Sequence, residues 1–173
     1  MMSHKAYVFD GELWGTEAAS LICAALNGQP TALRIFVHQH SNELKHPDTG
    51  EEMSLDWTAL SKLDAHELGN IAITRYYDPN ADVGLGEAWM RVDSLLPRDL
   101  RILALGKPLV SGETAFDPGK MGAYFQSFDL VEYNRDSAKL ELKHHPVLSE
   151  ALTPIIQMLE VAIRAKKGLY VTF

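Results

Sequence analysis

The hydrophobic pattern at the start of the chain predicts a strand followed by a helix. Residues Ala6 to Asp10 combine aromatic and β-branched side chains as strands do, and the Gly11 to Gly15 stretch favours a turn. Thr16 is a suitable N-cap, apolar residues then repeat on one helical face, and Asn27-Gly28 stops the helix. Apolar positions alternate from Thr31 to His38, so we expect a second strand there.

The middle of the chain alternates weak helical segments with short apolar ones. Residues 39–52 are polar and predict a loop, whereas Ser54 to Leu68 carries leucines among charges and predicts a weak helix. Asn70 to Tyr77 and Arg101 to Leu105 predict two further strands. Between them, Leu85 to Leu96 repeats its apolar residues at helical spacing, so this segment should form a helix that packs on a sheet.

The last third of the chain predicts a hairpin, a helix and a closing strand. Lys107 to Gly122 is rich in glycine, proline and serine and predicts a long irregular connection. Ala123 to Asn134 and Ala138 to Lys143 then predict two strands joined by a polar turn. A helix with Thr153 as N-cap and a proline at its first position should follow, and Leu169 to Phe173 predicts the last strand.

Together these elements predict one domain, residues 1–173, of the α+β class. The late hairpin requires antiparallel pairing, so we expect a mixed, largely antiparallel sheet with three to four packed helices. A chain of 173 residues with 46% hydrophobic composition is near the size of one domain and can build a core. No repeat or low-complexity linker divides it.

The charge of the chain is acidic and unevenly distributed. The net charge is −7, and the segment Ser41 to Glu67 holds seven acids against two lysines. From Arg135 to Lys167 the balance is reversed, with six bases and four acids. Because nucleic-acid phosphates favour clustered lysine and arginine, this distribution argues against a nucleic-acid partner and favours a basic protein.

Composition also predicts the compartment of the protein. No apolar run reaches the roughly 18 to 20 residues that a membrane span needs, and the N-terminal segment lacks the features of a signal peptide. The single cysteine, Cys23, fits a reducing environment and predicts a small buried apolar side chain. We therefore expect a cytoplasmic protein that does not bind membranes.

One motif suggests a metal site. His38 and His40 would project from the same face of a strand, and Glu43 could complete a divalent-metal site beside them. The spacing partly resembles the first motif of the cupins, although Ala32 stands where those proteins have glycine and no second motif follows. A metal-dependent enzyme or metal-binding protein therefore stays an alternative, while the main prediction includes no metal and no cofactor.

The rest of the sequence matches no catalytic template. The stretch around Asp10 resembles the nucleophile motif of haloacid-dehalogenase-like phosphatases, but the second aspartate that serves as general acid there is missing. Neither a phosphate-binding loop nor a nucleophile elbow occurs in the sequence. We therefore predict a protein without catalytic residues.

The acidic segment is the predicted binding surface. A tryptophan among carboxylates would anchor a basic partner, because aromatic residues dominate interface energy and complementary charge speeds encounter. Trp57 could instead pack inward at the start of a helix, and the sequence leaves both possibilities open. The predicted partner-binding residues are Glu43, Asp48, Glu51, Glu52, Asp56 and Trp57.

In size, acidity and lack of catalytic motifs, the whole chain resembles the immunity proteins of bacterial toxin systems. The resemblance implies a cytoplasmic bacterial protein that neutralises a cognate, basic toxin by covering its active site. It rests on no motif, so it implies no particular residue. The alternative to it, besides a metal protein, is a non-catalytic subunit of another assembly.

Overall fold

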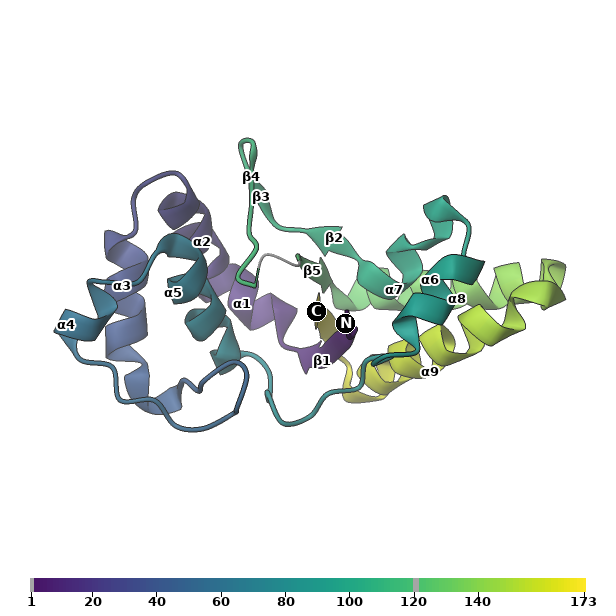
Figure 1. Ribbon diagram of the computed structural model, residues 1–173, viewed down its shortest axis with the longest axis horizontal. Helices are drawn as coiled ribbons and strands as arrows, with labels where there is room; N and C mark the ends of the chain where they lie inside the picture. The colour runs from purple at the N-terminus through teal and green to yellow at the C-terminus, as the bar shows by residue number, and fades with distance from the viewer. Residues whose placement is uncertain (1, 120–121) are drawn as a thin grey trace.

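The computed structural model describes residues 2–119 and 122–173 and has an α+β fold. A small sheet lies at the centre, with one group of helices on either side of it and the two chain ends close together (Figure 1). The predicted class and the antiparallel sheet are confirmed, while the structure contains more helix than the three to four elements expected from the sequence.

The central sheet has four strands in the order β1-β6-β5-β2, and all neighbours are antiparallel. Tyr170 of β6 lies opposite Tyr7 of β1 and Phe125 of β5. Two further strands form a small hairpin that projects from the body (Figure 1). The strands of the central sheet are β1 (Lys5–Phe9), β2 (Lys107–Pro108), β5 (Ala123–Gln126) and β6 (Gly168–Thr172), and those of the hairpin are β3 (Val110–Ser111) and β4 (Thr114–Ala115).

Each face of the sheet belongs to a different hydrophobic core, because successive side chains of a strand point to opposite faces. Tyr7, Phe9 and Tyr170 pack with the first group of helices. Ala6 and Val171 pack with the second group. The first group is α1 (Gly11–Glu17), α2 (Ala19–Leu26), α3 (Thr31–Gln39), α4 (Trp57–Leu60) and α5 (Ala65–Ala72), with the 3-10 turns η1 (Ser41–Glu43) and η2 (Ile73–Arg75).

The second group is dominated by two long antiparallel helices that pack side by side, α8 and α9 (Figure 1). The stretch Pro146–Ala165 is long and apolar enough to cross a membrane. Leu152, Ile155 and Leu159 in it are fully buried, so packing in the core accounts for its apolar face. The elements of this group are α6 (Trp89–Leu95), α7 (Ile102–Leu105), α8 (Phe128–His144) and α9 (Ser149–Ala165), with η3 (Arg98–Leu100) and η4 (Pro146–Leu148).

The predicted strand from Thr31 to His38 is wrong, because this segment forms α3. Leu33 and Val37 fit both a period of two and a spacing of four residues. Phe36 decides between them, since it is buried beside Leu33 and Val37 on one helical face while Ile35 remains 41% exposed.

Two other predicted strands are also helical. Asn70 to Tyr77 completes α5 and continues into η2, and a capping box between Asp64 and Glu67 starts that helix. Arg101 to Leu105 forms the short helix α7. Short apolar runs fit a buried helix as well as a strand, so periodicity alone did not distinguish them.

The predicted late hairpin is wrong as well. Only its first residues form β5, and Ser127 then accepts the backbone N–H of Leu130 and caps α8. Val131 and Ala138 are buried seven residues apart on the inner face of this helix. The sheet is nevertheless antiparallel, because β6 runs against both β1 and β5.

Two helices begin earlier than predicted, and one predicted loop contains strands. The first helix begins at Gly11 with Asp10 as its N-cap, so Thr16 lies inside it. The last helix begins at Ser149, with Pro154 inside it, because buried residues N-terminal to the proline extend its apolar face. The predicted irregular connection contains three short strands, and its residues 120–121 lie outside the described part.

Candidate protein-binding surface

The acidic charge of the protein lies on the side of the first helix group. Residues 1–80 carry 11 acids and 5 bases, whereas residues 81–173 carry 12 acids and 11 bases. The first part includes α1 to α5, which together cover one face of the sheet. We call these five helices with their connecting segments the acidic lobe.

The acidic loop, residues 44–56, is held in place at both ends. Leu44 is buried, and the backbone N–H of Lys45 donates to the hydroxyl of Thr74 at 3.0 Å. An antiparallel bridge joins Lys45 to Glu52 and closes the loop. The loop is therefore a fixed surface feature, although it contains no long helix or strand.

Gly50 fixes the turn at the tip of the acidic loop. Its φ of 69° lies in the left-handed region, and its N–H donates to the carbonyl of His46 at 2.8 Å. A Cβ at this position would overlap the side chain of Asn80. The backbone conformation therefore favours glycine here, and the exposed side chain of Asn80 would have to move aside for a larger residue.

Asp56 and Trp57 lie where the acidic loop meets α4. The carboxylate of Asp56 accepts the backbone N–H of Ala59 at 2.7 Å and caps the helix. Leu60 anchors α4 in the core, and its carbonyl accepts from Nε of Arg34 on α3 at 3.1 Å. These contacts orient α4 so that Trp57 keeps 49% of its surface exposed.

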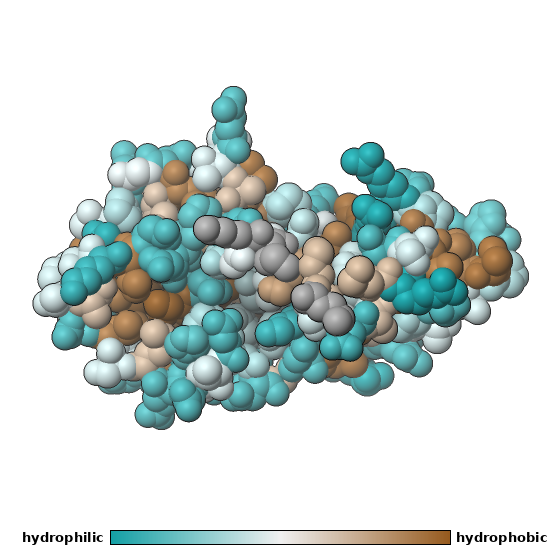
Figure 2. Space-filling view, in the orientation of Figure 1, coloured by the Kyte–Doolittle hydropathy of each residue, from teal (hydrophilic) through white to brown (hydrophobic). Residues whose placement is uncertain are grey.

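Trp57 joins a small apolar patch on α3. The ring of His38 meets the indole edge-on, with 5.3 Å between ring centroids, and Ile35 is exposed one turn away on the same helix. We call Ile35, His38 and Trp57 the Trp57 patch. Figure 2 shows apolar surface among hydrophilic residues at this end of the molecule, which is formed by α3, α4 and α5.

All six predicted partner-binding residues are exposed, but they do not form one continuous cluster. Asp48 lies beside the sheet, where it lines a small cavity with Tyr7 and Tyr77. Burial raises the pKa of Tyr7 to about 12, and the charges of Asp82 and Asp48 add to that shift. Asp48 therefore lies on the part of the acidic loop that faces the sheet, whereas Trp57 lies on α4.

Glu43 is engaged inside the acidic lobe. Its carboxylate pairs with the guanidinium of Arg75, which also binds Glu17 through a 3.0 Å contact. The hydroxyl of Tyr76 donates to Glu17 as well. Both contacts lower the pKa of the Glu17 carboxyl, and Arg75 has the larger effect. Glu43 thus connects η1 to η2, which leaves Glu51, Glu52 and Asp56 as the predicted acids best placed to meet a partner.

The three residues of the possible metal site do not come together. His38 lies in the last turn of α3 and His40 is the C-cap of that helix, so they do not share one face as they would on a strand. His38 contacts Trp57, while Nδ1 of His40 lies 3.5 Å from Glu43. Within residues 2–119 and 122–173, no three histidine, cysteine or acidic side chains are arranged to hold a metal ion.

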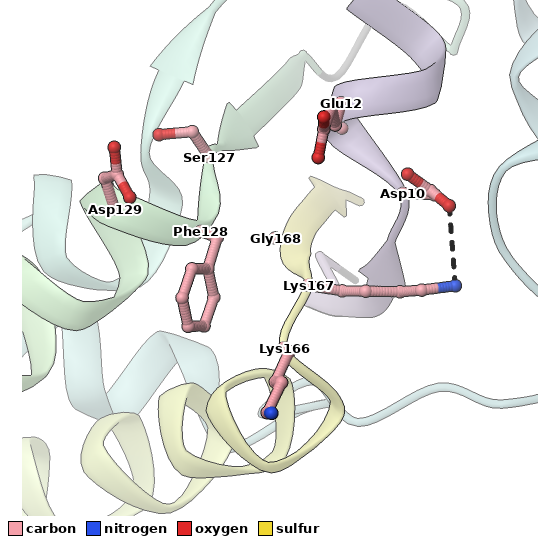
Figure 3. Close-up of a pocket in the computed structure, with 9 residues that line it drawn as sticks. Asp10, Glu12, Ser127, Phe128, Asp129, Lys166, Lys167 and Gly168 are labelled. Atoms are coloured by element: carbon pink, nitrogen blue, oxygen red, sulfur yellow. Dashed lines mark ion pairs between the residues drawn. The ribbon is translucent and has the colours of Figure 1, made fainter.

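A cleft that the sequence did not predict lies at one end of the sheet (Figure 3). Its volume is about 470 Å³, and it opens where β1 and β5 lead into α1 and α8. Lys167 pairs with Asp10 across 3.6 Å, and Glu12 and Ser127 lie on facing walls. The signal in the sequence was a capping residue directly after each strand, which the wrongly extended strand beyond Gln126 concealed.

The chemistry of this cleft does not select one class of ligand. Two lysines and the start of α8 attract anions, but Asp10, Glu12 and Asp129 oppose them. The hydroxyl of Ser127 already accepts the N–H of Leu130 as a helix cap. The lining residues include no histidine that could act as its base. We therefore place the candidate site on the acidic lobe.

Comparison with known proteins identifies no relative. No family model, no curated protein and no solved structure matches this chain.

Proposed function

We propose that this protein is a binding module whose acidic lobe docks on a basic surface of another protein. The observation that carries the proposal is the half-exposed Trp57 directly beside the acidic loop. An aromatic side chain of this kind can supply contact energy, while the surrounding carboxylates steer a basic partner and exclude acidic ones.

The arrangement of the surface supports rapid docking. Glu51 and Glu52 are exposed on the closed loop, and Asp56 is held by its helix cap, so these charges are preorganised. Little conformational freedom is lost when a fixed surface binds, which leaves more of the contact energy for affinity. The surface would meet its partner through Trp57 and the adjacent Asp56, with Glu51 and Glu52 on the neighbouring loop.

A more specific proposal is that the protein is an immunity protein and that its partner is a bacterial toxin. The small size, the acidic charge and the exposed acidic surface support it. The mechanism would be occlusion, in which the acidic loop and the Trp57 patch cover a basic active site. A non-catalytic subunit of a larger assembly could carry the same surface, so the two proposals differ in what the partner does.

Capture of partners from the native cell lysate tests the proposal. The bait is the whole protein, used at low and high salt, and bound proteins are identified by mass. We expect one basic protein that is lost at high salt, because screening weakens exposed charge interactions. The triple variant Glu51→Gln, Glu52→Gln and Asp56→Asn should capture about tenfold less, and asparagine preserves the helix cap.

The matched control is a second triple variant that has the same net charge as the first but leaves the acidic lobe unchanged. It combines Glu87→Gln, Asp99→Asn and Glu113→Gln, three exposed acids outside that lobe, and it should capture as much as the wild type. Trp57→Ala should also lose the partner. Equal loss in both triple variants, or capture that ignores salt and Trp57, would contradict docking through this surface.

An activity assay of the captured partner separates the two specific proposals. If the partner is a toxin, its activity should fall in a one-to-one complex with the wild type and remain with Trp57→Ala. A partner whose activity is unchanged, held in a complex with several other proteins, would replace the immunity proposal with the assembly subunit.

A further inference from the structure

The outer face of α8 carries large apolar side chains that are not covered. Tyr133 is 69% exposed and Leu140 is 53% exposed. They are seven residues apart, which places them two turns apart on the same side of the helix. Val147, in the turn η4 after the helix, is 86% exposed as well. The opposite face of α8 is buried against the core, so this line forms a separate outer stripe.

Charges beside the stripe change sign along the helix. Asp129 and Glu132 lie in its first half, and Lys143 and His144 lie in its last turn. In the described part of the chain, none of these four side chains has an ion-pair partner. The helix therefore presents an acidic end and a basic end around one apolar stripe.

When two copies of α8 lie antiparallel, the acidic end of each helix faces the basic end of the other. We propose that α8 packs antiparallel against α8 of a second copy of the protein, forming a symmetric dimer. Tyr133 of each copy would then lie beside Leu140 of the other, and the acidic end of each helix would face the basic end of its partner. A two-fold interface brings the same surface patch of both copies together, so complementarity within one helix is sufficient.

The size of the helix limits the strength of the dimer. The 17 residues of α8 span about 25 Å, so a single helix pair is at the small end of specific interfaces. We therefore expect a reversible dimer in the micromolar range. The acidic lobe covers the other face of the sheet, so the dimer and the proposed partner docking use different surfaces.

Two charge-reversal variants test the antiparallel arrangement. Asp129→Lys with Glu132→Lys makes both ends of α8 basic, and Lys143→Glu with His144→Glu makes both ends acidic. Sedimentation velocity is measured across roughly 1 to 300 µM, a range that brackets a weak dimer. The wild type should form dimers, each variant alone should dissociate at least about tenfold more easily, and an equal mixture should form the heterodimer.

Apolar variants provide the second measurement and its control. Leu140→Ser should abolish the dimer, whereas Met90→Ser, at an equally exposed position on α6, should leave it intact. Circular dichroism verifies that every variant is folded. A monomeric wild type, dimers in both charge variants alone, or a mixture without heterodimer would overturn the proposal. Dissociation by the acidic-loop triple variant, with α8 unchanged, would place the contact on the other lobe and also overturn it.

Discussion

The exposure of Trp57, on which the proposed docking depends, is a consequence of packing elsewhere in the acidic lobe. The acidic surroundings of this residue are visible in the sequence, but its exposure depends on how α4 is held by Leu60 and Arg34. These two residues are distant in sequence from one another, and nothing in the local pattern indicates that they meet. The exposure of the acids was easier to predict, because charged side chains are rarely buried without partners.

His4 is a second residue whose role only the structure reveals. It is fully buried between Trp89 and Phe173. Nδ1 accepts the N–H of Leu85 at 3.2 Å, which makes Nε2 the donor to the carbonyl of Ala104, also at 3.2 Å. The Nδ1 contact requires the neutral ring, and burial lowers the pKa of His4 below its ordinary value.

This environment predicts a loss of stability in mild acid. Because the pKa is lowered in the folded protein, the unfolded chain binds a proton that the folded chain does not. The free energy of unfolding should therefore fall as the pH drops below about 6.5, the ordinary pKa of histidine. His4→Gln should be less stable at neutral pH but should lose less stability between about pH 6.5 and 5. Urea titrations at several pH values measure this, and parallel losses in both proteins would show that other groups are responsible.

At the scale of elements, the first and last strands were predicted, β5 was predicted but extended too far, and β2, β3 and β4 were not predicted. β1 and β6 are rich in aromatic and β-branched residues, and they pair directly in the sheet. The segment of α3 has apolar residues that fit two periods, and only the burial of Phe36 resolves them. Tertiary packing, rather than local preference, therefore determined which segments became helical.

A glycine substitution tests whether the conformation of the acidic loop is fixed. Gly50→Ala should destabilise the protein by about 1 to 2 kcal/mol through the left-handed backbone, with a smaller further loss because the side chain of Asn80 must move aside. Gly28→Ala is the matched control, because Gly28 also has a positive φ, of 84°, but open space around it. Urea unfolding measures both variants. A loss in Gly50→Ala no larger than that in Gly28→Ala would mean that the loop can shift freely.

At the scale of the whole molecule, the sheet separates two surfaces of different character. One helix group carries most of the net negative charge and the Trp57 patch, and the other presents α8 with its two charged ends. The predicted α+β class is correct, although it was inferred from a late hairpin that the structure replaces with β5 and α8. Which helices would share a face of the sheet, and the cleft where two strands end, depend on contacts distant in sequence and were not predictable.

The association rate with the captured basic partner, measured against salt concentration, tests the central claim most directly. Steering by exposed charge acts mainly on this rate and weakens with ionic strength. The wild type and the control triple variant should show the same steep decrease with salt. The acidic-loop triple variant should start about tenfold slower and decrease less steeply. A rate that is the same in all three proteins and independent of salt would contradict docking through the acidic lobe.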